Sequence, residues 1–233
     1  MPMTAPPRRW GAGGLRPCQN APVTHELELA VEAARERVEA SDYGDRDAWT
    51  ALAQAERELA AARGEPWAEP IDLGVEWDVG APLPHLVSNG STAVLLCHAS
   101  ITDPNWDGTY VTVVSPTDPE PSSLLQFTFE RCHAIKFGGP NDEVLHGHPL
   151  SSRGLDGYRP HIVHNSQWIS EEERINSVHE SHRGGWHQSL RHYFFVFHDE
   201  MFEALAHEVR VERVHGVLLD RIQQAAAAVI GHG

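Results

Sequence analysis

The chain has 233 residues, of which 41% are hydrophobic and 22% are charged, a composition typical of a globular protein. Its formal net charge is −15 with histidine counted as neutral, and this excess of acid disfavours binding to nucleic-acid phosphates or to anionic membranes. We therefore expect a small-molecule substrate or a basic protein as partner, with no nucleic acid and no membrane.

The three cysteines, Cys18, Cys97 and Cys132, are far apart and form no C-x-x-C pair. Such a sparse, odd set favours buried free thiols in a reducing compartment over a disulfide framework. The N-terminus contains arginines but no apolar core of a secretory signal, and no apolar run approaches the ~20 residues of a membrane span. We expect a cytoplasmic protein.

The N-terminal part of the chain predicts a tail followed by two helices. Residues 1–23 are rich in proline, glycine and arginine without periodicity, which predicts a disordered tail. Residues 24–64 predict a helical hairpin that begins at Thr24, breaks at residues 41–45 and ends at Gly64. The side chains expected to face inward are Leu27, Val31, Ala34 and Val38 in the first helix and Trp49, Leu52, Ala55 and Leu59 in the second. The hairpin is expected either to pack on the main domain or to form a homodimer.

The rest of the chain begins with β-type patterns. Residues 65–92 carry four prolines and predict a linker and lead-in to a histidine-rich α+β domain at 93–233. Apolar runs and period-two alternation predict strands at residues 93–101, 110–114 and 123–137. In the last of these strands His133 falls on the apolar parity, which predicts a core or site histidine.

Residues 103–108, with the sequence D-P-N-W-D-G, match the opening of a calcium-binding loop. The match then fails, because the twelfth position is Val114 rather than glutamate and no helix is predicted on either side. Since Asp-Gly between two strands is a common hairpin turn, we favour a turn over a calcium site.

The second half of the chain alternates strands and helices. The predicted elements are a strand at 158–164, a helix at 170–181, strands at 191–199 and 202–212, and a closing helix at 214–229. Ser170 and Glu173 form a capping box at the start of the first helix. Residues 202–212 also fit a helix, but pairing back through Asp199 and Glu200 favours a strand. The predicted fold is α+β, a mainly antiparallel β-sheet or sandwich with an N-terminal helical hairpin, one inserted helix and a C-terminal helix.

Eleven of the 16 histidines lie within residues 132–207, among aromatic and acidic residues. On the predicted helix, His179 and His182 share the face that is expected to be buried, and Glu172 lies on the same stripe, one turn before Ile175. That face comprises Ile175, Val178, His179 and His182. Two imidazoles three residues apart can hold one metal ion, although histidines that border the core and cap the helix C-terminus have the same spacing.

Two further histidine patterns support the hypothesis of a metal site. His146 and His148 form an H-x-H segment, which places both rings on one side of an extended chain. The acid that a cupin motif would add four residues later is absent, since that position is Ser152. His198 with Asp199 ends a predicted strand, where the pair suits a metal ligand with a neighbouring acid, or a general base.

The predicted site is a divalent metal centre, zinc or iron, for hydrolytic or oxygen-dependent chemistry on a small molecule. The candidate metal ligands are His146, His148, His179, His182 and His198, and the candidate catalytic acids are Asp199 and Glu172. The sequence contains no G-x-S-x-G elbow, Walker A loop, Rossmann glycine fingerprint or H-E-x-x-H motif. Two alternatives therefore stay open: a non-catalytic acidic interaction protein of the inhibitor or immunity type, and a small-ligand binding module.

Overall fold

The computed structural model describes residues 21–41, 45–101 and 114–231. Most of the predicted tail, the predicted strand at 110–114 and the calcium-like loop at 103–108 lie wholly or largely outside these ranges. In chain order the elements are α1 (Ala21–Ala40), α2 (Arg46–Arg63), β1 (Trp67–Pro70), β2 (His85–Ser88), β3 (Thr92–His98), β4 (Ser122–Glu130), β5 (Ala134–Gly138), the 3₁₀ helices η1 (Asp142–Gly147) and η2 (Ser151–Arg153), β6 (Pro160–His164), α3 (Gln167–Asn176), the 3₁₀ helix η3 (Trp186–Ser189), β7 (Arg191–Val196), β8 (Met201–Ala206), β9 (Glu208–Gly216) and α4 (Leu218–Gly231).

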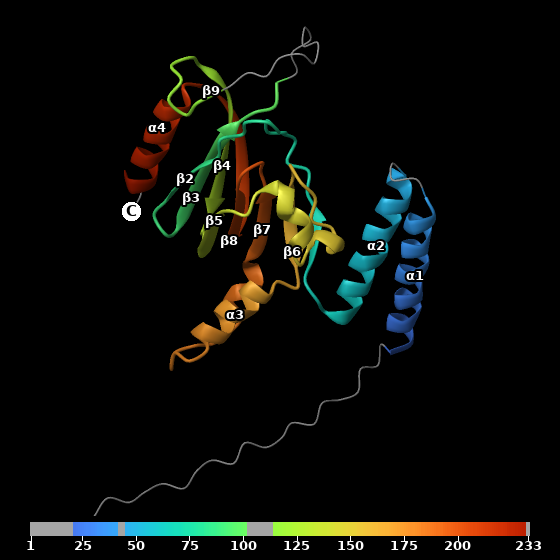
Figure 1. Cartoon of the computed structure of the whole chain (residues 1–233). Helices are drawn as coiled ribbons and strands as arrows, with labels where there is room; N and C mark the ends of the chain where they lie inside the picture. The colour runs from blue at the N-terminus through green and yellow to red at the C-terminus, as the bar shows by residue number, and fades with distance from the viewer. Residues whose placement is uncertain (1–20, 42–44, 102–113, 232–233) are drawn as a thin grey trace, which may run out of the picture.

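Two antiparallel sheets form a sandwich, which confirms the predicted α+β fold. One sheet has the strand order β1-β6-β7-β8-β5 and the other β2-β3-β4-β9. The helix α4 and the α1–α2 hairpin lie on opposite sides of the sandwich (Figure 1). None of the helices in the described part of the chain is long and apolar enough to span a membrane.

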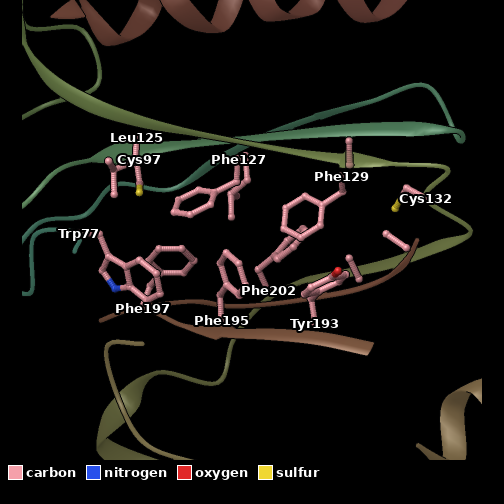
Figure 2. Packing of buried hydrophobic residues seen from close by; sticks show 14 of the residues in the cluster. Trp77, Cys97, Leu125, Phe127, Phe129, Cys132, Tyr193, Phe195, Phe197 and Phe202 are labelled. Atoms are coloured by element: carbon pink, nitrogen blue, oxygen red, sulfur yellow. The ribbon is translucent and has the colours of Figure 1, made fainter. Parts of the chain in front are cut away.

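The core between the two sheets is aromatic (Figure 2). Phe127 and Phe129 point inward from β4, and they meet Phe195 and Phe202 from the facing sheet. The rings of Phe127 and Phe195 meet edge to face, with centroids 5.1 Å apart, and those of Phe129 and Phe202 are 4.8 Å apart. Because each fully buried phenylalanine contributes roughly 1.5–3 kcal/mol, these contacts hold the two sheets together. The apolar positions of the predicted alternation in β4 therefore form part of the inward face of the sandwich.

A bent two-stranded ribbon joins the sheets. The single strand predicted at 123–137 is wrong: it divides into β4 and β5, which belong to different sheets. The strand assignment at 202–212 is confirmed over the helical alternative, but it divides into β8 and β9 in the same way. Between the pairs Glu130↔Glu208 and Ala134↔Leu205, three residues of one strand face two of the other. Such a one-residue bulge bends the ribbon, and Arg131 adopts a left-handed φ of 48° there.

The two outer faces of the sandwich are covered differently. On the four-stranded sheet, Leu218, Ala225 and Val229 of α4 pack on a cluster that includes Val94 and Leu96, as their spacing predicts. This helix begins at Leu218 rather than at 214 because β9 continues to Gly216. On the five-stranded sheet, residues of the η1–η2 segment pack on a second apolar cluster.

The predicted helical hairpin is present as α1 and α2, and Val31 is buried on the predicted inner face. Trp49 is 48% exposed, so its predicted inward position is wrong; the neighbouring Ala48 is fully buried instead. The hairpin adjoins the η1–η2 segment, where Arg153 forms an ion pair with Glu65 at 2.8 Å. The segment predicted as linker and lead-in contributes two edge strands, β1 and β2.

The inserted helix is shorter than predicted, and it begins earlier. Ser166, not Ser170, is the N-cap of α3, since its hydroxyl oxygen accepts the N–H of Ile169 at 3.2 Å. The helix ends at Asn176, so Val178, His179 and His182 of the predicted face lie beyond its end. Val178 is 87% exposed, and the prediction that this face is buried is therefore wrong.

Candidate functional site

The five predicted metal ligands are distributed over three parts of the fold. His146 and His148 lie at η1, His179 and His182 follow α3, and His198 lies in the turn between β7 and β8. Among the described residues, no three histidine, cysteine, aspartate or glutamate side chains are grouped so that they could hold a metal ion. The metal centre therefore stays a prediction, and the site must be sought from the partners that each histidine has.

The first histidine group follows α3. The Oε1 of Glu173 lies 2.9 Å from His182 Nε2, and its Oε2 lies 3.1 Å from His187 Nδ1. Burial acts to raise the pKa of Glu173, but the hydrogen bond to His182 and the nearby imidazoles leave it below its ordinary value. His179 instead accepts the backbone N–H of Ser181 at 3.1 Å. The two predicted ligands of this segment thus have separate, local partners.

A second group is buried on the outer face of the five-stranded sheet. His192 Nδ1 lies 2.8 Å from Ser166 Oγ, and its Nε2 lies 2.8 Å from Glu203 Oε2. The order Ser–His–Glu is that of a nucleophilic triad. However, Ser166 is only 6% exposed and already caps α3, so the hydroxyl is not presented to a substrate. This chain of hydrogen bonds fastens α3 to the sheet.

Two predicted site residues lie next to this group. The ring of His148 contacts Phe194 edge to face at 5.2 Å, and burial lowers the pKa of His148. Glu172 accepts the indole N–H of Trp168 at 3.3 Å, and its second oxygen lies 3.2 Å from His133 Nε2. His133 was predicted to lie in the core or a site, but 33% of its side chain is exposed. The bulge in the ribbon turns His133 out of the core, because it breaks the alternation of β4.

The third group surrounds His198 and is open to solvent. Asp142 Oδ2 lies 3.2 Å from His198 Nδ1 and also accepts the hydroxyl of Tyr158. The hydrogen bond to Asp142 raises the pKa of His198, while the bond from Tyr158 and that to His198 lower the pKa of Asp142. The same contact raises the pKa of Tyr158 to about 12. The predicted acid Asp199 acts on His198 through its negative charge, and Asp142 makes the hydrogen bond.

Neither Asp142 nor Tyr158 was among the predicted site residues. Asp142 begins η1, and its backbone N–H donates to the carbonyl of His198 at 2.9 Å. Tyr158 has a left-handed φ of 60°, a conformation that costs energy in a residue with a Cβ atom. No local sequence pattern marks either residue, since both acquire their partners only when distant segments pack together.

A pocket of about 520 Å³ opens beside the third group. Its lining includes Asp72, Glu76, Trp77, Ser100, Tyr158 and Arg159, and we call it the Trp77 pocket. Trp77 is 2% exposed, and its indole N–H has no hydrogen-bond partner among the described residues. In Figure 2 the indole nitrogen lies at the outer end of the aromatic core. A buried donor without a partner costs roughly 1–3 kcal/mol, so this N–H is an unusual feature of a residue that lines the pocket.

No family model, curated protein or solved structure matches this chain. A function must therefore be argued from the geometry of the side chains. Tyr158 is the point at which two features meet, because it lines the Trp77 pocket and bonds to Asp142 of the third group.

Proposed function

We propose that the protein is an enzyme that carries out acid–base chemistry on a small polar molecule held in the Trp77 pocket. The observation that carries this proposal is the double role of Tyr158, which forms part of the pocket wall and of the Asp142–His198 group. A pocket of about 520 Å³ is within the usual range for small-molecule sites. The side chain of His198 is 41% exposed, so protons can exchange with solvent.

The contacts suggest a division of roles within the group. With Nδ1 directed at Asp142, His198 keeps Nε2 available to accept or donate a proton. Asp142 orients the imidazole and favours its charged form. The hydroxyl of Tyr158 donates a hydrogen bond to Asp142 and thereby holds the carboxylate in place. In this proposal Asp142 takes the role that the sequence suggested for Asp199.

The test is a turnover assay with a defined library of amino acids, organic acids, sugars and nucleosides, followed by proton NMR. We expect the protein to consume at least one compound, and His198→Gln to slow that reaction by at least about 100-fold. Val79→Trp should abolish it, because Val79 lines the pocket and is 60% exposed, so the larger side chain can block the pocket without disturbing the core. His146→Gln, a change of an exposed histidine on η1, is the matched control.

Two outcomes would contradict this proposal: binding in the pocket without turnover of any compound, or turnover that His198→Gln leaves unchanged. The first outcome would favour the binding-module or interaction-protein alternatives. Repeating the assay with added zinc or ferrous iron tests the metal-dependent alternative. Among the histidine groups, Glu173 with His182 and His187 has the chemistry closest to that alternative. The small-molecule partner and the cytoplasmic location remain parts of the proposal.

A further inference from the structure

The position of Trp77 is fixed both by contacts of its ring and by pairing of its backbone. Its ring stacks on Phe195 with centroids 5.6 Å apart and lies 4.8 Å from the ring of Phe197. Its backbone pairs with Ala99, and the neighbouring N–H of Ser100 donates to the carbonyl of Glu76 at 2.9 Å. The indole cannot turn to find a partner without breaking these contacts. The indole is therefore a fixed part of the pocket wall, and its N–H is a donor without a partner among the described residues.

Charged residues of both signs line the same pocket as Trp77. Arg159 is exposed, and its ion pair with Asp156 is long, at 3.6 Å, with both side chains more than half exposed. Asp72 already accepts the N–H of Gly74 at 2.7 Å. The carboxylate of Glu76 is exposed and has no hydrogen bond or ion pair with another residue that the structure describes. A guanidinium and a carboxylate thus remain available in the pocket that Trp77 lines.

We propose that the Trp77 pocket binds a small zwitterion, with its carboxylate on the Trp77 N–H and Arg159 and its ammonium group on Glu76. This inference rests on the proposed function, since it names the class of molecule that the same pocket takes. A purely anionic ligand would meet the repulsion of Asp72 and Glu76, and a purely cationic one would leave the Trp77 donor without a partner.

The experiment follows the indole N–H signals of ¹⁵N-labelled full-length protein by NMR, and Trp77→Phe assigns the signal of Trp77. The probes are diglycine, which carries both charges, acetate and methylammonium. We expect diglycine to shift the Trp77 signal saturably, acetate to act at least about 10-fold more weakly, and methylammonium to leave it unchanged. The signal of Trp49, which is 48% exposed on α2, should not move with any probe.

Variants of the charged residues keep the inference testable even if Trp77→Phe does not fold. Glu76→Gln and Arg159→Gln should each weaken diglycine binding at least about 10-fold, measured on the Trp77 signal. The matched control is Arg174→Gln, because Arg174 is an exposed arginine of α3 with a similar 3.6 Å ion pair. This control should bind diglycine as the parent does.

Several results would overturn the inference. These are a Trp77 signal that no probe shifts, equal effects of acetate and diglycine, or unchanged diglycine binding in Glu76→Gln. Failure here is distinguishable from failure of the proposed function. If a library compound of another charge type is consumed in a His198-dependent reaction while diglycine has no effect, only the zwitterion inference fails. If diglycine binds as expected but no reaction depends on His198, only the catalytic proposal fails.

Discussion

Histidines of the same segment have pKa values that shift in opposite directions because their surroundings differ. His161 is fully buried, its Nε2 accepts the N–H of Asp156 at 3.0 Å, and burial lowers its pKa to about 4. His198 is largely open to solvent, and the hydrogen bond to Asp142 raises its pKa. Acid therefore acts on these two residues in opposite directions: protonation disturbs the site of His161, whereas it strengthens the contact of His198 with Asp142.

Replacing Asp142 by asparagine should lower the pKa of His198 toward its ordinary value of 6.5, because the partner that favours imidazolium is lost. A histidine whose pKa is higher in the folded than in the unfolded state contributes to stability. This contribution is fully present below the unfolded pKa and is lost as pH rises through the folded pKa. NMR titration of the His198 ring measures the change. Asp199→Asn is the control, since Asp199 acts on His198 through its charge. Equal shifts in both variants would show that Asp142 has no special role.

At the scale of elements, Ser166 connects α3 to the sheet beneath it. Ser166→Ala should lower the free energy of unfolding by between about 1 and 3 kcal/mol, because the helix loses its cap and the buried His192 loses a partner. Denaturant unfolding measures the loss. The control is Ser170→Ala, which removes only a hydroxyl bond to the carbonyl of Ser166 at 3.1 Å and should cost less than about 1 kcal/mol. An equal loss in both variants would contradict this account of α3.

The start of α3 also shows why local patterns misplace a helix. Ser166 and Ser170 stand one turn apart, and only Ser170 is followed by glutamate at the capping-box position. The local pattern thus favours Ser170. The structure uses Ser166 because its hydroxyl also reaches His192, a contact between segments that are distant in the sequence. Period-two alternation predicted the inward face of β4, and helical periodicity predicted the closing helix α4, since each depends only on a local repeat.

In the candidate site too, residues marked by a local sequence pattern could be predicted, and residues that meet only through distant contacts could not. Sequence reasoning selected His198 from its position at the end of a strand. It missed Asp142 and Tyr158, because the packing of η1 and of the segment before β6 against the β7–β8 turn brings them to His198. It also missed the bend of the ribbon at Arg131, since the odd-numbered apolar positions continue across the bulge as if the strand were unbroken.

The stability of the whole molecule should fall as pH decreases from about 6.5 to about 4. In this window the unfolded chain binds a proton at His161 that the native state does not, because burial lowers the folded pKa from 6.5 to about 4. A shift of this size corresponds to about 3 kcal/mol at the acid end of the window. Burial lowers the pKa of His98 and His148 as well, which adds to the loss. Denaturant unfolding at several pH values measures the slope. His161→Gln should flatten it, and an unchanged slope in that variant would refute this explanation.

Because β4 precedes β7 and β8 in the chain, the two halves of the aromatic core are synthesised at different times. Phe127 and Phe129 are synthesised before Phe195 and Phe202, the rings that cover them, and much of the histidine-rich segment lies between the two pairs. At roughly 5–20 residues per second, translation leaves this half of the core without its cover for on the order of several seconds. Until β7 and β8 have left the ribosome, the growing chain therefore exposes an aromatic surface that the finished protein hides.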